Sequence, residues 1–489
     1  AASDVYKRQQ IADSNSEKLV AANCYEGLVR IMADGTIGKG VATDWNISDD
    51  GLTYTFKLRN NSHWAMFSGH KAVLGENYED TFDITVKAED FKFGIERTLS
   101  EQTGSADAPL FSAVKSISTP DDFTIVFNLS YADDNFLYAL TNPGAMPCDE
   151  EFFNLTNGKY GLDAKYLLCN GPFHVSKWTE KTSVKLAKNN EYNGESSVSP
   201  SSVTFYINND DSEVADKMNS VTYDVAFLSS SQFSSIENKK DLNSVAVQNV
   251  TYSFIFNQND NNYRNKNMRL AFCRSCDTSS LFDSQSDISK ADGIVPPSCK
   301  IGGEDYRNGN AAELLSYDET LAKKNFNDAL LELGSSSVET TILCTEQYEP
   351  FVKQMVQKLQ KTLGVKFVST VKVVSESDLE AAVNDGNYSV AFYPFKAKSS
   401  FAGEIIEVFD QNNIFGYESD VLSQKIRNIK NNSGSLEGER SAVADAENYL
   451  VSEAVIMPVF YENSYFVTSK KTSGIYFYSC LLYTSDAAD

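Results

Sequence analysis

The chain has 489 residues, of which 42% are hydrophobic, and its 67 acidic and 43 basic residues give a net charge of -24. This length exceeds one typical hydrophobic core and predicts two or three domains. The acidic balance excludes a surface built to bind nucleic acid or anionic lipid, and no run approaches the roughly 18 apolar residues of a membrane-spanning helix.

The two ends of the chain are interpreted as foreign sequence. Residues 1–9 and residues 480–489 correspond to one transposase sequencing adaptor, translated in different frames at the two ends. Such segments are set aside in fold reasoning, as tags are. We expect the native part to run from about Gln10 to Ser479.

The first half of the chain is predicted to be rich in β-strands. The residues Ser48-Asp49-Asp50-Gly51 are typical of a tight turn. Apolar and polar side chains then alternate up to Leu58, which is typical of a strand with one buried face. A helix is expected to begin at Ala88, with one face formed by Phe91, Ile95 and Leu99. Further strands are predicted at residues 124–129, 203–207 and 223–227.

The second half alternates between helical and strand patterns. Apolar residues fall at helical spacing over residues 352–363, and Gly364 follows as a C-terminal cap. A strand at 365–374, a short helix at 379–383 and a strand at 388–395 are expected next. This order predicts an α/β unit.

The cysteines offer two patterns, and neither is decisive. Cys273 and Cys276 form a single Cys-x-x-Cys pair without the further ligands of a zinc site, so two core residues on one helix are favoured. Cys148 and Cys169 flank a compact segment and could form a disulfide in an oxidising compartment. Sequence alone cannot assign that pairing.

No catalytic constellation is found. The three histidines, His63, His70 and His174, have neither a nucleophile-elbow context nor metal-ligand spacing. The glycines near Asp34-Gly35 do not form a phosphate-binding loop, because that dipeptide is typical of a hairpin turn. We therefore expect no enzyme, no metal and no cofactor.

Short motifs occur in a defined order along the chain. They lie at residues 25–30 (Tyr-Glu-Gly-Leu-Val-Arg), 40–45, 48–59, 64, 86–91, 170–173 with 177–178, 257 with 267–271, 317–318 with 322–324, 363–365 and 457–461. This ordered set resembles the family 5 solute-binding proteins, the oligopeptide and dipeptide binders, from Ile11 to Ile475. An insertion between Trp64 and Thr85 departs from the family and is interpreted as a surface elaboration.

The resemblance implies an α/β fold, the two-lobed clamshell of type II periplasmic binding proteins in its large three-domain, cluster C variety. Domain I is expected to combine residues 10–47, 169–257 and 455–479, and domain II to extend the same lobe with residues 48–168. Domain III, the second lobe, is expected at residues 258–454. Ligand would be enclosed between the lobes and would have to contact both to favour closure.

The same resemblance implies an extracytoplasmic, monomeric substrate-binding protein of an ABC importer. It would capture small peptides or peptide-like solutes and deliver them to the membrane permease. Its location would be periplasmic, or lipid-anchored at the outer face of the cytoplasmic membrane. The alternatives are a sugar-like or anionic non-peptide solute, and a ligand-binding sensor or receptor on the same fold.

One position departs from the peptide-binding pattern of the family. Members that bind peptides fix the free amine with an aspartate ten residues after the aromatic that corresponds to Tyr388, and this position is Lys398 here. An arginine of the family corresponds to Phe392. Because a lysine would repel a desolvated amine, we hypothesise a ligand with a neutral or anionic end. The alternatives are a solvated Lys398, or a local gap that brings one of three acids to the site: Glu404, Glu407 or Asp410.

The ligand-binding candidates follow from position in this resemblance. They are Asn15, Phe227, Ser229, Tyr252, Phe254, Phe392, Tyr393, Phe395, Lys396, Lys398 and Tyr461. Aromatic walls suit a pocket that tolerates varied side chains, because they supply contact area without specific polar demands. Plain core packing is the alternative for each aromatic.

Overall fold

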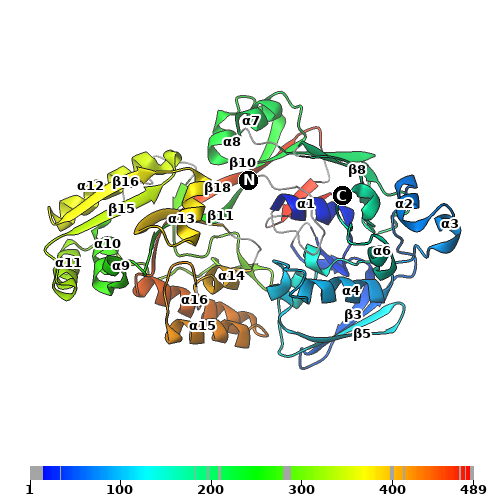
Figure 1. The fold of residues 1–489 in the computed structure, drawn as a ribbon, viewed down its shortest axis with the longest axis horizontal. Coiled ribbons are helices and arrows are strands. Elements are labelled where there is room, and N and C mark those ends of the chain that lie inside the picture. The colour runs from blue at the N-terminus through cyan, green and yellow to red at the C-terminus, as the bar shows by residue number, and fades with distance from the viewer. Residues whose placement is uncertain are drawn as a thin grey trace. The chain divides into compact units, whose positions relative to one another are not determined.

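The computed structural model describes residues 15–32, 35–180, 182–194, 198–207, 211–278, 288–396, 401–410, 413–472, 475–478 and 481–484. The chain divides into two units, and many of their elements are labelled in Figure 1. Unit 1 comprises Ala1–Ser244, Ser433–Ser435 and Phe466–Asp489, and unit 2 comprises Val245–Asn432 and Leu436–Tyr465. The finer division into three domains stays a prediction.

Unit 1 contains a four-stranded antiparallel sheet in the order β3-β4-β6-β5. Its strands are β3 (Ala42–Ile47), β4 (Thr53–Leu58), β5 (Val114–Asp121) and β6 (Thr124–Leu129). The alternation predicted for β4 is confirmed, because Tyr54, Phe56 and Leu58 are buried while Lys57 is exposed. The strand predicted at 124–129 is confirmed as β6.

Helix α4 (Ala88–Leu99) packs against β5 and β6, as the predicted helix from Ala88 requires. Its first turn is closed by Asp90, whose carboxylate accepts a hydrogen bond of 2.8 Å from the Lys87 backbone N–H. Phe91 and Ile95 are fully buried. Leu99, predicted on the same face, is 36% exposed at the last position of the helix, because residues four apart drift around an axis of 3.6 residues per turn.

The other elements of unit 1 include a second sheet, β7-β8-β9, and the hairpin β1-β2 predicted from Asp34-Gly35. The strands predicted at 203–207 and 223–227 are present as β9 and β10, displaced by one or two residues. These elements are α1 (Asn15–Cys24), β1 (Val29–Ile31), β2 (Ile37–Lys39), α5 (Phe136–Ala139), α6 (Glu150–Leu155), β7 (Phe173–Thr179), β8 (Ser183–Lys188), β9 (Ser202–Tyr206), α7 (Asp211–Asn219), β10 (Val225–Ser229), α8 (Ser230–Ser235), β19 (Ile475–Tyr478) and β20 (Leu481–Thr484).

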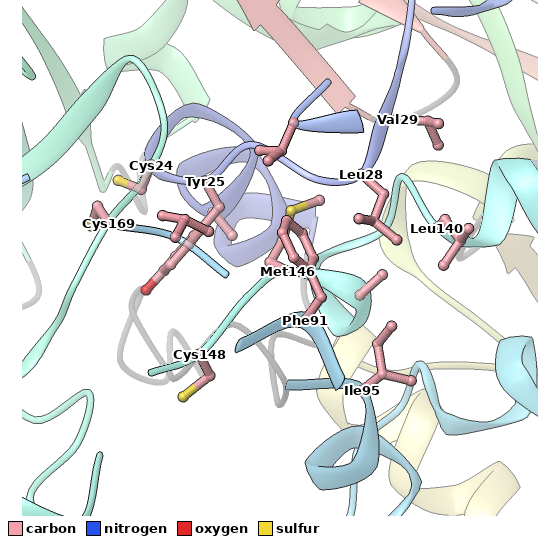
Figure 2. Packing of buried hydrophobic residues seen from close by; sticks show 14 of the residues in the cluster. Cys24, Tyr25, Leu28, Val29, Phe91, Ile95, Leu140, Met146, Cys148 and Cys169 are labelled. Atoms are coloured by element: carbon pink, nitrogen blue, oxygen red, sulfur yellow. The ribbon is translucent and has the colours of Figure 1, made fainter. Parts of the chain in front are cut away.

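The core of unit 1 contains the cysteines for which a bridge was considered. Cys24, Cys148 and Cys169 are all buried and all free (Figure 2). The structure does not place Cys148 and Cys169 as partners: the Cys148 thiol has a hydrogen bond with Tyr160, whereas the neighbour of Cys169 is Cys24. Sequence spacing identified a compact segment between Cys148 and Cys169. It did not identify the neighbour of each thiol, because packing between distant segments determines that neighbour.

The insertion after Trp64 folds into two short helices, α2 (Lys71–Leu74) and α3 (Tyr78–Thr81). Its interpretation as a surface elaboration was wrong for His70, which is fully buried. His70 Nε2 donates to the Leu167 carbonyl at 2.9 Å. The ring of Phe67 lies 4.2 Å from His70 and stacks on His174 at 5.4 Å. The insertion is thus anchored in unit 1 through an aromatic and histidine cluster.

Unit 2 is built around a mixed sheet in which β18-β11-β17-β15-β16 are neighbours in this order. Its strands are β11 (Leu242–Phe256), β15 (Val338–Cys344), β16 (Phe367–Val373), β17 (Val390–Lys396) and β18 (Ile456–Ser469), with β12 (Ile288–Lys290) paired to β18. The predicted strand-helix-strand order is confirmed: α12 (Glu349–Leu363) ends at Gly364, and β16, α13 (Glu376–Asn384) and β17 follow. Strand β15 pairs in parallel with β16 and β17.

Helices cover both faces of this sheet. One buried cluster joins the sheet to α10 (Lys266–Ser275), α11 (Glu319–Leu333) and α12. The other joins it to α13, α14 (Ala402–Glu407), α15 (Asp420–Asn431) and α16 (Leu436–Ser452). Cys273 and Cys276 lie in the first cluster, which confirms their interpretation as core residues. The short elements α9 (Asn261–Arg264), β13 (Lys300–Ile301) and β14 (Glu304–Asp305) complete the unit.

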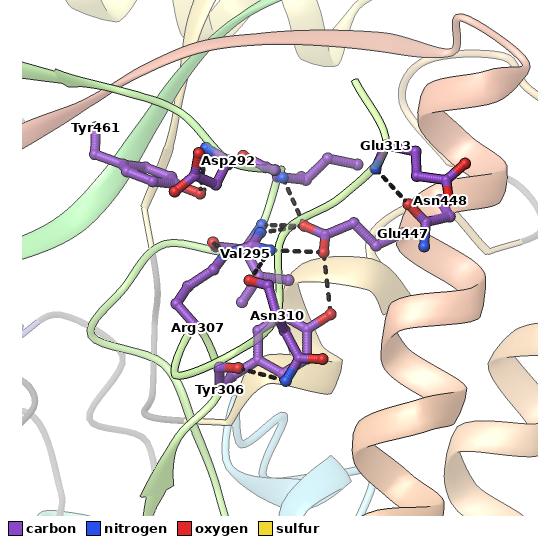
Figure 3. Close-up of polar contacts among 11 residues, drawn as sticks. Asp292, Val295, Tyr306, Arg307, Asn310, Glu313, Glu447, Asn448 and Tyr461 are labelled. Atoms are coloured by element: carbon purple, nitrogen blue, oxygen red, sulfur yellow. Dashed lines mark hydrogen bonds and ion pairs between the residues drawn. The ribbon is translucent and has the colours of Figure 1, made fainter. Parts of the chain in front are cut away.

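A buried ion pair joins the segment after β14 to α16 (Figure 3). Glu447 is 1% exposed in its side chain, and it binds Arg307 through both carboxylate oxygens. It also accepts hydrogen bonds from the backbone N–H groups of Ile294 at 2.6 Å and Val295 at 2.9 Å, and from the Tyr306 hydroxyl at 3.0 Å. Every oxygen of this buried charge is therefore satisfied, which is the condition under which such a pair is tolerated.

We expect Glu447→Gln to lower the free energy of unfolding by about 3–5 kcal/mol, because Arg307 would remain buried without its counter-charge. The control is Glu453→Gln, which removes the partner of a half-exposed Lys266 and should cost no more than about 1 kcal/mol. Urea unfolding of both variants at pH 7 measures the difference. Equal shifts of the two midpoints would contradict the role assigned to Glu447.

The histidine cluster predicts a loss of stability in acid. Burial, and then the nearby His174, lowers the pKa of His70 to about 4, against an ordinary 6.5. Between these values the unfolded chain binds more protons, so stability is full above pH 6.5 and falls towards pH 4, by up to about 3 kcal/mol. In unfolding scans from pH 7.5 to 4.5, His70→Gln should flatten this dependence while keeping an N–H for Leu167. His63→Gln, a change outside the cluster, should leave it unchanged.

Candidate ligand-binding site

Seven of the eleven candidate residues lie on three neighbouring strands of unit 2, β18, β11 and β17. Strands β11 and β17 are antiparallel, and their register places Phe254 opposite Phe392 and Ser253 opposite Tyr393. Because successive side chains of a strand point to opposite faces, the candidates separate into two sets. Each set belongs to a different layer of the unit.

The first set joins an aromatic cluster. Tyr252, Phe254 and Phe392 pack with three rings that the sequence argument did not select: Tyr348, Phe351 and Phe460. The Tyr252 ring lies 4.4 Å from Tyr348, and Phe254 lies 4.9 Å from Phe392. All of these rings are buried except Phe351, which is partly buried. Their first role is therefore core packing, the alternative considered for them.

One edge of this cluster is polar. The Tyr348 hydroxyl donates to Glu462 Oε1 at 2.5 Å, and Gln347 Nε2 donates to the same oxygen at 3.4 Å. A hydrogen bond also joins the side chains of Tyr252 and Tyr348. Burial, and then the Glu462 carboxylate, raises the pKa of Tyr252, and burial raises that of Tyr348. Both hydroxyls therefore keep their protons at neutral pH and can act as donors.

The second set lies towards the other helical layer. Tyr393 is partly buried there, and Phe395 stacks on Phe409 with ring centres 5.7 Å apart. Tyr461 is 2% exposed. Its hydroxyl accepts from the Asp292 backbone N–H at 3.1 Å and donates to the Gly293 carbonyl at 3.3 Å (Figure 3). Tyr461 thus fixes β18 to the loop that Glu447 also holds.

Two hydroxyls on this side were missed by the sequence argument. Thr251 and Ser253 alternate with Tyr252 along β11 and are fully buried. Neither hydroxyl has a hydrogen-bond partner among the residues that the structure describes. A buried polar group without a partner is costly, so such groups mark positions where a polar partner is expected. The period-two pattern of residues 250–256 could have identified them, because both are polar positions in an otherwise apolar run.

Two further candidates lie in unit 1, on β10. Phe227 is 44% exposed, which makes its ring available to a ligand. Ser229 caps α8: its hydroxyl accepts from the Gln232 N–H at 3.3 Å, and its own N–H donates to Gln232 Oε1 at 2.7 Å. The Ser229 hydroxyl therefore has a structural role. Residues 208–210 lie outside the part of the chain that the structure describes.

The remaining candidates lie at the margins of the described chain. Lys396 is the exposed last residue of β17. Asn15 opens α1, but its side chain lies outside the described residues, and so does Lys398. Two of the acids considered as substitutes for an amine anchor have partners inside unit 2. Glu407 is 3.7 Å from Lys430, and Asp410 accepts from Ser423 at 2.9 Å.

Within the described part of the chain, no group of three or more His, Cys, Asp or Glu side chains could hold a metal ion. None of the described helices has the length and apolar character needed to cross a membrane.

Comparison with known proteins gives consistent matches over nearly the whole length. The chain is similar to the dipeptide-binding protein DppE of Bacillus subtilis (strain 168), with 23% identity over 476 residues that cover 93% of this chain and 84% of the relative. It is also similar to the oligopeptide-binding protein OppA of the same strain, with 23% identity over 482 residues, 93% of this chain and 85% of the relative.

Solved structures share the fold. The dipeptide binding protein from Pseudoalteromonas sp. SM9913 in complex with Met-Leu has a TM-score of 0.77 at 18% identity, covering 98% of this chain and 96% of that chain. OppA of Listeria monocytogenes bound to peptide has a TM-score of 0.73 at 21% identity, covering 96% and 93%. The predicted α/β solute-binding fold is thereby confirmed. Residues 36–414 match the family described as bacterial extracellular solute-binding proteins, family 5 Middle, and the chain belongs to this family.

Proposed function

We propose that this protein is the substrate-binding component of an ABC importer, which captures peptides outside the cytoplasm and delivers them to the membrane permease. The observation that carries the proposal is the similarity to a dipeptide-binding protein over 93% of the chain. The proposal keeps the predicted capture between two lobes. In this proposal, a ligand favours a closed conformation only if it contacts both lobes.

The candidate groups of unit 2 suit a peptide. Ser253 and Thr251 supply hydroxyls that can donate to or accept from a peptide backbone. The aromatic rings beside them, such as Tyr393 and Phe395, add contact area that does not depend on the identity of the ligand side chain. This combination fits backbone recognition with tolerance of sequence, whereas a sugar site would need many fixed polar groups.

The other features of the proposal follow from family membership. The family is extracellular, and we propose a lipid anchor or a periplasmic location for this member. We propose no catalytic activity, since the family and the similar proteins named above are solute-binding proteins. A monomer is proposed as the working form. The hypothesis of a neutral or anionic ligand end, based on Lys398, is retained.

A thermal-unfolding screen tests the proposal. A ligand at 100 times its dissociation constant adds about 2.7 kcal/mol of stability. We expect a tripeptide with a free amine and its N-acetyl form both to raise the unfolding midpoint, with the N-acetyl form at least as effective. A panel of mono- and disaccharides should have no effect. Stabilisation by sugars alone would contradict peptide binding, whereas stabilisation by the free-amine form alone would contradict only the hypothesis based on Lys398.

The buried hydroxyls of β11 allow binding and stability to be separated. Thr251→Val and Ser253→Ala remove hydroxyls that have no described partner, so the ligand-free protein should be as stable as the wild type or more so. If these hydroxyls bind the ligand, calorimetry should show about tenfold weaker peptide binding for each, which corresponds to about 1.4 kcal/mol. The control is Ser423→Ala, which removes a hydroxyl that donates to Asp410 and should lower stability without changing affinity.

A further inference from the structure

Two cysteines of unit 1 that are distant in sequence have their thiols in contact. Cys24 is the last residue of α1, and Cys169 lies four residues before β7. A side-chain hydrogen bond joins the two thiols. Figure 2 shows the pair side by side, with Cys148 in another part of the core. We propose that Cys24 and Cys169 form a disulfide bond when this protein folds in an oxidising environment.

The backbone holds the two segments together on the C-terminal side of the pair. The Gly171 N–H donates to the Cys24 carbonyl at 2.9 Å. The Asn170 amide bridges the backbone of Glu26, accepting from its N–H at 3.0 Å and donating to its carbonyl at 2.8 Å. A Cβ at position 171 would lie 2.7 Å from the carbonyl carbon of Cys24, so only glycine allows this approach.

A further contact fixes Cys169 itself. Its carbonyl accepts a hydrogen bond of 2.7 Å from the Ala65 N–H, at the start of the insertion. Cys24 is completely buried and Cys169 is 2% exposed. Because a disulfide demands a narrow range of Cα and Cβ separations, the decisive requirement is that the fold brings the two backbones together without strain. Here the non-covalent contacts already do so.

The reaction is an exchange with a disulfide oxidant. Cys24 and Cys169 each lose one proton and one electron as the S–S bond forms. The disulfide of a small molecule or of a protein disulfide oxidoreductase takes up the two electrons and two protons and becomes two thiols. Burial, and then contact with Cys169, raises the pKa of Cys24 well above its ordinary value. The thiolate is the attacking form, so oxidation of the folded protein should be slow. The bond is therefore expected to form during folding, before this core closes.

The family is extracellular, and disulfides persist in the oxidising environment outside the cytoplasm. The bond would close a long loop that contains α4, the four-stranded sheet and the insertion. A cross-link over a long loop restricts the unfolded chain, which raises the stability of the folded unit. The same burial that slows oxidation would protect the finished bond from reductants.

The test begins with the full chain, refolded from denaturant in a glutathione redox buffer and in parallel with excess reductant. Free thiols are then alkylated under denaturing conditions and mapped by mass spectrometry. We expect the oxidised sample to protect two of the eight cysteines and to yield one linked peptide, Cys24 with Cys169. The midpoint of thermal unfolding should be several degrees higher for the oxidised sample than for the reduced one.

Single alanine variants provide the matched controls. Cys24→Ala and Cys169→Ala should abolish the linked peptide and the difference between oxidised and reduced midpoints. Cys148→Ala, a change at another buried cysteine, should keep both. The wild-type comparison needs no variant, so a poorly folding mutant does not weaken the test. Full alkylation of the oxidised wild type, or a linked peptide with a different pairing, would overturn the proposal.

Discussion

The organisation of unit 2 depends on one constraint: strand β11 is buried on both faces. From Asn249 to Phe256 every residue is buried, because helices cover the sheet on each side. Alternate side chains must therefore serve two separate cores. Tyr252 and Phe254 pack in one layer, and the polar Thr251 and Ser253 must point the other way. A polar group in such a strand needs a hydrogen-bond partner, so the two hydroxyls are candidates for contact with a ligand.

Two buried carboxylates also stabilise local structure. Glu447 fixes the loop after β12 to α16, and the Glu26 carboxylate in unit 1 pairs with Arg59 and accepts from Tyr192. In each case the carboxylate has several donors around it, so the cost of removing it from water is offset by hydrogen bonds as well as by the opposite charge. These acids hold irregular segments that neither a helix nor a sheet would fix.

Local patterns were sufficient for many elements. The period-two run up to Leu58 and the helical run that ends at Gly364 both specify their structure within a few residues, and both were predicted from sequence. Contacts between distant segments left no such pattern. Three contacts are examples: Cys24 with Cys169, His70 with Leu167, and Tyr348 with Glu462. Each joins residues more than 90 positions apart, and only the folded chain brings them together.

For the candidate site, too, part of the information could not be read from the sequence. Family resemblance pointed to aromatic residues on β11 and β17, but it could not say which face each one serves. The register of the two strands decides that question. Tyr252, Phe254 and Phe392 make a rigid aromatic layer, whereas Tyr393 and Phe395 share their side of the sheet with the hydroxyls of Ser253 and Thr251. Recognition of a peptide backbone needs both fixed hydrogen-bonding groups and an apolar surface, and we propose that the alternation along β11 places the first beside the second.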